Sequence, residues 1–259
     1  MKLSIIIPVY DEADNILNVY QELCELTLPP AYKVEIVIVD DLSTDQTPKV
    51  LNSIQSTSDN IVVIRHPQRL GQSAAIASGI SASDGEIIVT MDGDGQNVAQ
   101  DIAILLAQLC PRTACVNGVR SVRHDSRLKV FSSQVANRAR RWLLNDPIID
   151  AGCGLKVIRR DALCGLPYFN GMHRFLPSML HMQGHVVRQV FIQQRERKSG
   201  RSKYGIGNRL WKGLVDCVAM LWFRRYCFSH LKMQSHTASS TLSEKSELRD
   251  KQPLSVHDD

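Results

Sequence analysis

The pattern with the clearest chemical meaning is a short acidic segment, MDGDGQN, at residues 91–97. Asp92 and Asp94 are separated by one glycine, and Gln96 follows two residues later. Gly93 and Gly95 allow a tight turn, on which alternate carboxylates can face a single cation. Oxygen ligands of this kind suit Mg²⁺ or Mn²⁺, which typically also take phosphate oxygens from a substrate. The alternative is an ordinary acidic turn, because Asp-Gly-Asp alone is a common sequence.

A second acidic cluster lies in VDDLSTDQT, residues 39–47. Ser43, Thr44 or Asp45 can cap a helix that follows, which explains one of these three residues. Capping leaves the doubled Asp40-Asp41 unexplained. A carboxylate there could accept N–H groups from a nucleotide base.

A third cluster lies in PVYDEADN, residues 8–15. Tyr10 offers a ring that can stack on a base, and Glu12 can bond to a base or a ribose. The alternative is that Asp11 or Asp14 caps the next helix. The three clusters together favour a site for a nucleotide and a metal ion.

The segments around these clusters predict the elements that position them. Short apolar runs rich in β-branched residues are typical of strands buried on both faces of a parallel sheet. Apolar residues at helical spacing predict a helix after each of these runs. The strands are expected at 3–9, 34–39, 61–65 and 86–91, and the helices at 15–26, 47–54, 72–82 and 101–109.

Strand and helix therefore alternate four times, which predicts a doubly wound α/β sheet. Ligands bind such sheets beyond the carboxyl ends of the strands. Each acidic cluster follows a predicted strand directly, so we expect the three clusters to converge on one edge of the sheet.

The rest of the chain is less regular. We expect a helix at 132–144, a strand at 186–193 and an amphipathic helix at 211–226, which either packs on the domain or lies in a membrane interface. From Lys232 the composition is polar and predicts a disordered tail. No run of about 18 apolar residues is present to span a bilayer. The first residues are interpreted as a strand, not as a signal peptide.

Composition places the chain among ordinary globular proteins. It has 259 residues, of which 44% are hydrophobic and 22% charged, and its net charge is +5. Seven cysteines without a C-x-x-C pair favour reduced thiols in the cytosol over a disulfide framework or a zinc site. Two segments, 120–141 and 188–212, are rich in Lys and Arg. They indicate attraction to phosphates, nucleic acid or anionic lipid, or else a solvated basic surface.

These motifs carry a family resemblance. PVYDE, VDDLSTD, the glycine of RLGQSAA and MDGDGQ resemble, in order and spacing, the catalytic domain of family-2 glycosyltransferases. NGVR, DAGCGLKVIRRDAL, GMHRFLP and RKSGRSKYGIGNR resemble the branch that includes dolichol-phosphate mannose synthase and bacterial polyprenyl-phosphate glycosyltransferases. The likeness covers roughly residues 3–225. The sequence departs from the family at Asp11, usually Asn, and at Gly93, often Ala, and neither change removes a ligand.

The resemblance implies a Rossmann-like, mostly parallel sheet of the GT-A type, and it implies a role for each motif. The nucleoside would be held by Pro8, Tyr10, Glu12, Val39 and Asp41. Asp92, Asp94 and Gln96 would bind Mg²⁺ or Mn²⁺ on the donor diphosphate, and Gly93 would belong to the same donor-binding set. Asp92 and Asp94, with Arg197 and Lys203, would be the catalytic residues. Arg120, Arg197 and Lys203 would contact donor phosphates or sugar, and Arg123, Arg127, Lys129 and Arg138 would grip an acceptor phosphate.

The acceptor follows from the balance of charge between residues 120 and 212. A sugar hydroxyl needs a general base, whereas a phosphate monoester is already mostly dianionic near neutrality. This region is rich in Arg and poor in acids, which favours a phosphate acceptor held by bidentate Arg contacts. Asp146 and Asp150 are the later carboxylates of this region. Asp150 could be a base, or it could equally anchor Arg159 or Arg160. His173 and Arg174 could line the acceptor or sugar pocket, although a lone His is more often structural.

The sequence therefore predicts an inverting, metal-dependent transferase that moves a sugar from a UDP- or GDP-sugar to polyprenyl phosphate. We expect a catalytic domain at 1–210, the amphipathic helix at 211–231 and a polar tail at 232–259. We expect it to associate peripherally with the cytoplasmic face of the membrane, although members of this branch often end in membrane helices. The alternatives are a saccharide or lipid-linked sugar acceptor and, from another class, a basic nucleic-acid-binding module.

Overall fold

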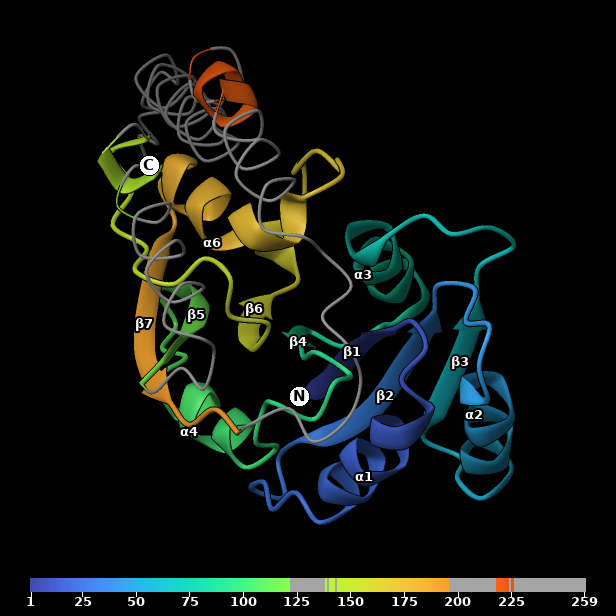
Figure 1. Ribbon diagram of the computed structural model, residues 1–259. Helices are drawn as coiled ribbons and strands as arrows, with labels where there is room; N and C mark the ends of the chain where they lie inside the picture. Colours follow the sequence, from blue (N-terminus) through green and yellow to red (C-terminus); the bar gives the residue numbers. More distant parts are fainter. Residues whose placement is uncertain (122–137, 139, 143, 196–217, 224, 226–259) are drawn as a thin grey trace, which may run out of the picture.

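The computed structural model describes residues 1–121, 138, 140–142, 144–195, 218–223 and 225. Its centre is a seven-stranded sheet with helices on both faces (Figure 1). The strand order is β3-β2-β1-β4-β6-β5-β7. The strands are β1 (Lys2–Val9), β2 (Lys33–Asp40), β3 (Ile61–Arg65), β4 (Ile87–Thr90), β5 (Thr113–Arg120), β6 (Lys156–Arg159) and β7 (Val186–Ile192).

The helices alternate with the strands over the first half of the chain. They are α1 (Ala13–Cys24), α2 (Thr47–Ser56), α3 (Gln72–Ala82) and α4 (Asp101–Ala107), and α6 (Met172–Met182) follows a short 3₁₀ turn at Asp161–Leu163. Helical residues also lie within 138–144 and 218–225. The predicted doubly wound α/β sheet is confirmed, and the predicted elements of the first 110 residues agree with the structure to within a few residues.

The sheet is parallel except at β6, which pairs antiparallel with both β4 and β5. β1 lies between β2 and β4 and is parallel to both. The carboxyl ends of β1, β2 and β4 therefore meet at one edge of the sheet. The antiparallel direction of β6 brings its first residue, Lys156, to the same edge, opposite Thr90 of β4.

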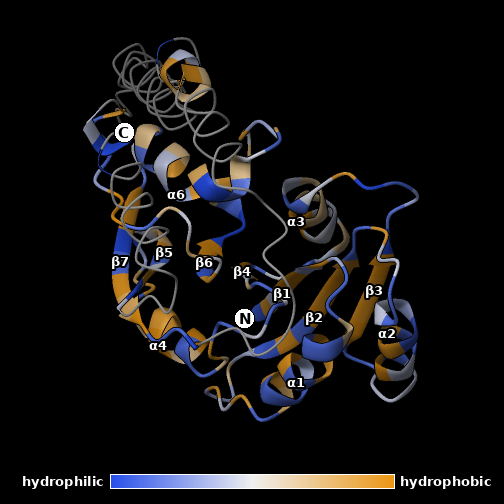
Figure 2. Ribbon diagram, viewed as in Figure 1, coloured by the Kyte–Doolittle hydropathy of each residue, from blue (hydrophilic) through white to orange (hydrophobic). Residues whose placement is uncertain are grey.

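Two apolar clusters cover the two faces of the sheet. Alternate residues of β1 point to opposite sides, so that Ile5 and Ile7 pack with α1, α2 and α4, and Ile6 packs with α3 and α6. Figure 2 shows β2 and β3 as mostly hydrophobic, and α1 and α2 as mixed. This two-sided burial explains why the strand sequences are continuous apolar runs.

The second half of the chain differs from the prediction in several elements. β5, β6 and α6 were not predicted, and the expected strand at 186–193 is β7. The expected helices at 132–144 and 211–226 lie partly outside the described residues, as does the tail from 232. In the part of the chain that the structure describes, no helix combines the length and the hydropathy needed to cross a membrane.

Candidate active site at the carboxyl edge of the sheet

The three acidic clusters lie at the edge where β1, β2 and β4 end. Val9 pairs with Asp40 in the parallel register, and the backbone N–H of Asp41 donates to the Val9 carbonyl at 2.9 Å. The N–H of Met91 donates to the Ile6 carbonyl at 3.1 Å, which fixes the start of the 91–97 segment beside β1. The predicted convergence is therefore present in the structure, because neighbouring parallel strands end at one edge.

The segment 92–97 forms a closed turn. The Asp92 N–H donates to Asn97 Oδ1 at 3.3 Å, and the Gln96 N–H donates to Asp94 Oδ1 at 3.2 Å. Gly95 has φ +73°, a backbone conformation that favours glycine. At Gly93 a β-carbon would lie 2.6 Å from Val9 Cγ1, so a larger residue would require the Val9 side chain or the turn to shift. Gly93, between the two aspartates, thus packs closely on β1, and Gly95, after Asp94, has a backbone conformation that glycine adopts readily.

Asp92 is half-buried with a second carboxylate nearby. Burial, and after it the charge of Asp94, raises the pKa of Asp92 to about 6, against the lowering effects of Lys156, Arg120 and Gln72. Two carboxylates held together at a partly desolvated edge repel each other unless a cation lies between them. This donor set fits a hard divalent cation, with Asp92, Asp94 and Gln96 as ligands. Among the described residues, no group of three or more His, Cys, Asp or Glu side chains is arranged so that it could hold a metal ion.

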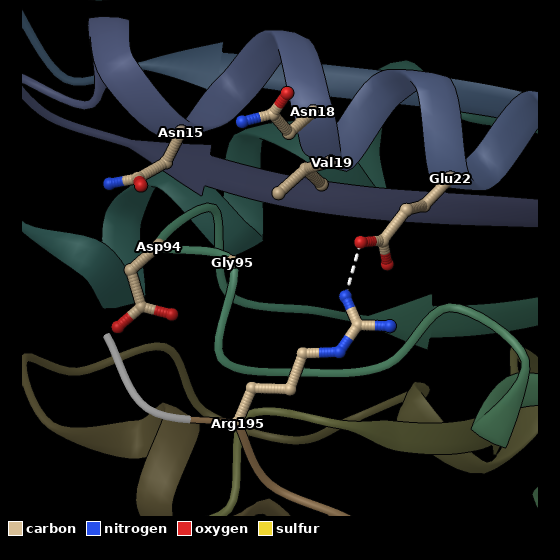
Figure 3. A pocket seen from close by; sticks show the side chains of 7 residues that line it. All are labelled: Asn15, Asn18, Val19, Glu22, Asp94, Gly95 and Arg195. Carbon is tan, nitrogen blue, oxygen red and sulfur yellow. Dashed lines mark hydrogen bonds and ion pairs between the residues drawn. The ribbon is translucent and has the colours of Figure 1, made fainter. Parts of the chain in front are cut away.

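A segment that follows β7 runs beside this turn. The Arg195 N–H donates to the Gln96 carbonyl at 2.9 Å, and Asn97 forms an antiparallel bridge with Gln194. Arg195 also forms an ion pair with Glu22 of α1, across a small cavity lined by Asn15, Asn18 and Val19 as well as by Asp94 and Gly95 (Figure 3). The chain therefore passes the acidic turn two residues before Arg197.

On the β2 side, the chain itself binds the carboxylate of Asp41. Asp41 is buried and accepts the N–H groups of Leu70 and Gly71, each at 2.8 Å, and its Oδ1 lies 2.9 Å from Nδ1 of His66. This geometry fixes the loop that begins α3. A direct bond from Asp41 to a base would have to share an oxygen with these groups.

The other predicted nucleoside residues differ in accessibility. Tyr10 is half-buried, with the guanidinium of Arg69 3.8 Å from its ring centroid, so one face of the ring is already covered. Glu12 accepts a bond from Asn15 Nδ2 at 2.7 Å. Pro8 is half-buried, whereas the Val39 side chain is fully buried in the core with α3, which leaves only its backbone for a ligand.

The caps of the first two helices differ from the prediction. Neither Asp11 nor Asp14 caps α1, whose N-cap is Glu12 without a side-chain capping bond. Asp11 instead accepts the Thr44 N–H at 2.7 Å across the loops. The N-cap of α2 is Gln46, in place of the expected Ser43, Thr44 or Asp45. Asp45 nevertheless accepts the N–H groups of Thr47, the first residue of α2, at 2.8 Å and of Ala13 at 3.2 Å. These bonds join the acidic clusters at residues 8–15 and 39–47 to each other.

Arg120 and Asp150 form a bidentate pair near the acidic turn. Nε and an Nη of Arg120 donate to the two oxygens of Asp150 at 2.7 and 2.9 Å. The expectation that Asp150 anchors Arg159 or Arg160 is wrong. Those two arginines donate to backbone carbonyls of other segments and, for Arg160, also to the Ser83 hydroxyl. The positive charge of Arg120 lowers the pKa of Asp92, so Arg120 interacts electrostatically with the acidic turn.

Most of the predicted basic residues lie outside the described residues: Arg123, Arg127, Lys129, Arg197 and Lys203. Arg138 is described and is exposed on a helical segment. That segment is anchored by Arg140, which is buried and pairs with Asp146, while Ser178 of α6 lies 3.2 Å from Arg140 Nη1. Asp146 is therefore a structural partner of Arg140 in the interior.

His173 lies at the start of α6 and contacts α3. Its Nδ1 is 2.7 Å from Ser73 Oγ, which also accepts the Gly171 N–H at 2.9 Å. Burial, and then the charges of Arg174 and Lys156, lower the pKa of His173 to about 3. His173 is therefore a neutral residue that joins two helix N-termini beside the site.

The sequence analysis did not single out Gln72, Gly154 or Lys156, which all lie around Asp92. Gln72 Nε2 donates to Asp92 Oδ1 at 2.8 Å, and a β-carbon at Gly154 would lie 2.1 Å from Asp92 Oδ2. Lys156 is 3% exposed, and its ammonium donates to the Cys153 carbonyl. Lys156 stands directly before the apolar pair Val157-Ile158, and a lysine beside a buried apolar pair is a signal that could have identified it, because buried lysines are rare. Gln72 carries no such signal.

The sequence of this chain is similar to those of known bacterial proteins. A dodecaprenyl-phosphate galacturonate synthase of Rhizobium johnstonii is 27% identical over 87% of this chain and 68% of its own length. An undecaprenyl-phosphate 4-deoxy-4-formamido-L-arabinose transferase of Pseudomonas fluorescens is 28% identical over 78% of this chain and 60% of its own length. The chain thus spans about two thirds of each relative.

Solved structures share the fold. The mannosyltransferase PcManGT of Pyrobaculum calidifontis, in complex with GDP-Man and Mn²⁺, has a TM-score of 0.63 and 22% identity over 84% of this chain and 63% of its own. Glucosyl-3-phosphoglycerate synthase of Mycobacterium tuberculosis, in complex with Mn²⁺ and UDP-glucose, has a TM-score of 0.62 and 19% identity over 86% and 78% of the two chains. At these identities the likeness shows the fold alone.

The family assignment rests on a longer sequence pattern than any single motif. The family model described as glycosyl transferase family 2 matches residues 4–166. The match runs from β1 through the 3₁₀ turn after β6, and it includes all three acidic clusters. The chain therefore belongs to glycosyl transferase family 2.

Proposed function

We propose that this chain transfers a sugar from a nucleotide-diphosphate sugar to a polyprenyl phosphate, in a metal-dependent reaction that inverts the anomeric carbon. The observation that carries the proposal is the half-buried pair Asp92 and Asp94 at the carboxyl end of β4, beside the strand-end residues of β1 and β2. A sheet edge of this kind is where α/β proteins bind nucleotides. Both sequence relatives are transferases named for a polyprenyl phosphate, which supports the acceptor.

Each group of residues has a proposed role. Asp92, Asp94 and Gln96 hold Mg²⁺ or Mn²⁺, and Arg120, Arg197 and Lys203 contact the donor diphosphate or sugar. Arg123, Arg127, Lys129 and Arg138 bind the acceptor phosphate. The nucleoside lies against Pro8, Tyr10, Glu12, the backbone of Val39 and Asp41. The Mn²⁺ in two structures of the same fold supports a divalent cation in this role.

The chemistry is a direct displacement at the anomeric carbon. As the glycosidic bond breaks, negative charge grows on the departing nucleoside diphosphate, and the cation supplies Lewis-acid stabilisation when it is bound. Arg120 adds positive charge at the turn, and its bidentate bond to Asp150 keeps its guanidinium in place. A single displacement from the opposite side inverts the configuration.

The ion pairs of two carboxylates bear on whether the acceptor is a phosphate or a hydroxyl. Asp150 accepts two side-chain bonds from Arg120, and Asp146 is buried against Arg140. Asp146 and Asp150 are the later carboxylates of the Arg-rich region between residues 120 and 212, and both have structural partners. A phosphate acceptor needs no general base at neutral pH, because its second pKa is about 6. The arrangement therefore favours a phosphate over the alternative hydroxyl acceptor, and family membership favours the transferase over a nucleic-acid-binding module.

A polyprenyl acceptor places the reaction at a membrane surface. We propose that the chain associates peripherally with the cytoplasmic face. The segment 211–231 is the proposed contact, and its described residues are helical with Trp222 60% exposed. Trp and Arg together are typical of helices that lie in the interface.

The proposal is tested with purified full chain, Mn²⁺, a panel of labelled UDP- and GDP-sugars, and two acceptors. One acceptor is a short polyprenyl phosphate and the other is the matching polyprenol, which offers a hydroxyl in place of the phosphate. The expected product is a polyprenyl-phosphate sugar with inverted anomeric configuration and no product from the polyprenol. Transfer to the polyprenol, or to an added saccharide but not to the phosphate, would overturn the assigned acceptor.

A further inference from the structure

Gln72 makes a contact with the acidic turn that the motifs do not indicate. It is the first residue of α3, and its Nε2 donates to Asp92 Oδ1 at 2.8 Å. The Gln72 side chain is exposed, so the bond replaces bonds to water and contributes little to folding, on the order of 1 kcal/mol or less. The contact is therefore better explained by what it does to Asp92 than by stability.

The backbone around Gln72 is held on both sides. The N–H of Gly71 donates to Asp41 Oδ2 at 2.8 Å, and Gly71 has φ +90°. On the other side, Ser73 Oγ accepts the Gly171 N–H at 2.9 Å and lies 2.7 Å from His173 Nδ1. The first turn of α3 is thus fixed to β2 and to α6, and it presents the Gln72 amide at a defined place.

Gly154 also limits the position of the Asp92 carboxylate. A β-carbon at Gly154 would lie 2.1 Å from Asp92 Oδ2, so the carboxylate lies directly against the backbone there. Oδ1 accepts the Gln72 amide, and both oxygens lie close to the position that a β-carbon of residue 154 would take. A carboxylate has about four lone-pair positions, so one accepted bond leaves acceptor capacity for a cation.

We infer that Gln72 is a positioning residue that orients the Asp92 carboxylate for the divalent cation, an inference that rests on the proposed metal-dependent function. Hydrogen-bond donors behind a metal ligand fix its orientation, and their loss typically lowers metal affinity about 10- to 100-fold. The first turn of α3 then couples the nucleoside side of the crevice, through Asp41, to the metal side, through Asp92.

The test measures Mn²⁺ binding to the full chain directly, from the electron paramagnetic resonance signal of free Mn²⁺, with and without added UDP or GDP. Gln72→Met keeps the length of the side chain and removes its N–H donors, and Gln72→Ala removes the side chain. Gln55→Met, on the exposed face of α2, is the matched control, and Asp94→Ala is the reference for loss of a ligand.

Both Gln72 variants are expected to bind Mn²⁺ about 10- to 100-fold more weakly than the wild type, with melting temperatures unchanged. In the transfer assay, the Mn²⁺ concentration for half-maximal rate rises by the same factor, and the rate at saturating Mn²⁺ returns close to that of the wild type. Wild-type affinity in Gln72→Met, with affinity lost in Asp94→Ala, overturns the role of Gln72 alone. Absence of Mn²⁺ binding to the wild type overturns this inference together with the proposed metal site.

Discussion

Asp92 lies so close to Gly154 that a β-carbon at position 154 would stand 2.1 Å from its Oδ2. The two residues are 62 positions apart in the sequence and meet because β6 runs antiparallel to β4. The Thr90 hydroxyl donates to the Gly154 carbonyl at 2.7 Å, which holds the two segments together just before the acidic turn. The carboxylate proposed to bind metal is thus placed by a strand from the second half of the chain.

Gly154→Ala should displace the Asp92 carboxylate. Because misplacing a reacting group by about 1 Å can cost about 100-fold in rate, we expect a loss of transfer activity of that order. The rate and the Mn²⁺ affinity are measured beside the melting temperature. Gly154→Ser is expected to lose at least as much transfer activity. Full activity in both variants would show that the Asp92 carboxylate can shift without affecting transfer.

Asp92→Asn should stabilise the metal-free protein at neutral pH. The pKa of Asp92 is raised to about 6 from its ordinary 3.8, so the folded state binds the proton more tightly than the unfolded state. Stability therefore falls as the pH rises from about 4 to 6, and the ionised carboxylate costs about 1–3 kcal/mol above that range. Urea denaturation in EDTA at pH 7.5 and at pH 4 measures this, with a gain expected at pH 7.5 and a smaller difference at pH 4.

His173 should give the opposite pH dependence. Its pKa is lowered to about 3 from an ordinary 6.5, so the unfolded state takes up the proton first as the pH falls. Its contribution to stability is present above about pH 6.5 and is lost as the pH falls toward 3. We expect the free energy of unfolding of His173→Gln to depend less on pH between 7.5 and 5 than that of the wild type. An unchanged slope would contradict a buried neutral histidine.

Asp150→Asn separates an anchoring role from a catalytic one. The substitution weakens a bidentate pair that is largely buried, and we expect a loss of about 2–4 kcal/mol in stability and a higher KM for the nucleotide sugar. Because a phosphate acceptor needs no base, kcat should keep its pH profile. A large fall in kcat, with the loss of the rise in kcat that accompanies ionisation of the base and with stability unchanged, would instead identify Asp150 as a general base.

The strands β1 to β4 could be predicted from the sequence, because their local apolar pattern matches their position in the sheet. β1 to β4 are continuous apolar runs because both faces of the sheet are covered. The edge that carries Asp41 and Asp92 follows from that order of elements, since parallel neighbours end together. For this reason the main acidic residues at this edge of the sheet could be found without a structure.

The second half could not be read in the same way. β5 contains Asn117 and Gly118, which resemble a turn, but the buried Asn117 amide donates to the carbonyls of Gly118 and Asp150. α6 contains Pro177, which ordinarily ends a helix. The contacts of Gln72 and Gly154 with Asp92 depend on pairing between distant segments, and no local pattern encodes them.

The central claim is that a divalent cation at Asp92 and Asp94 stabilises the departing diphosphate. The most direct measurement is the transfer rate of the wild type, Asp92→Ala and Asp94→Ala after full chelation and then with increasing Mn²⁺. We predict no transfer by the chelated wild type, recovery with Mn²⁺, and a loss of at least about 100-fold in both variants at any Mn²⁺ concentration. Undiminished transfer by the chelated wild type, or by Asp92→Ala or Asp94→Ala, would contradict the account.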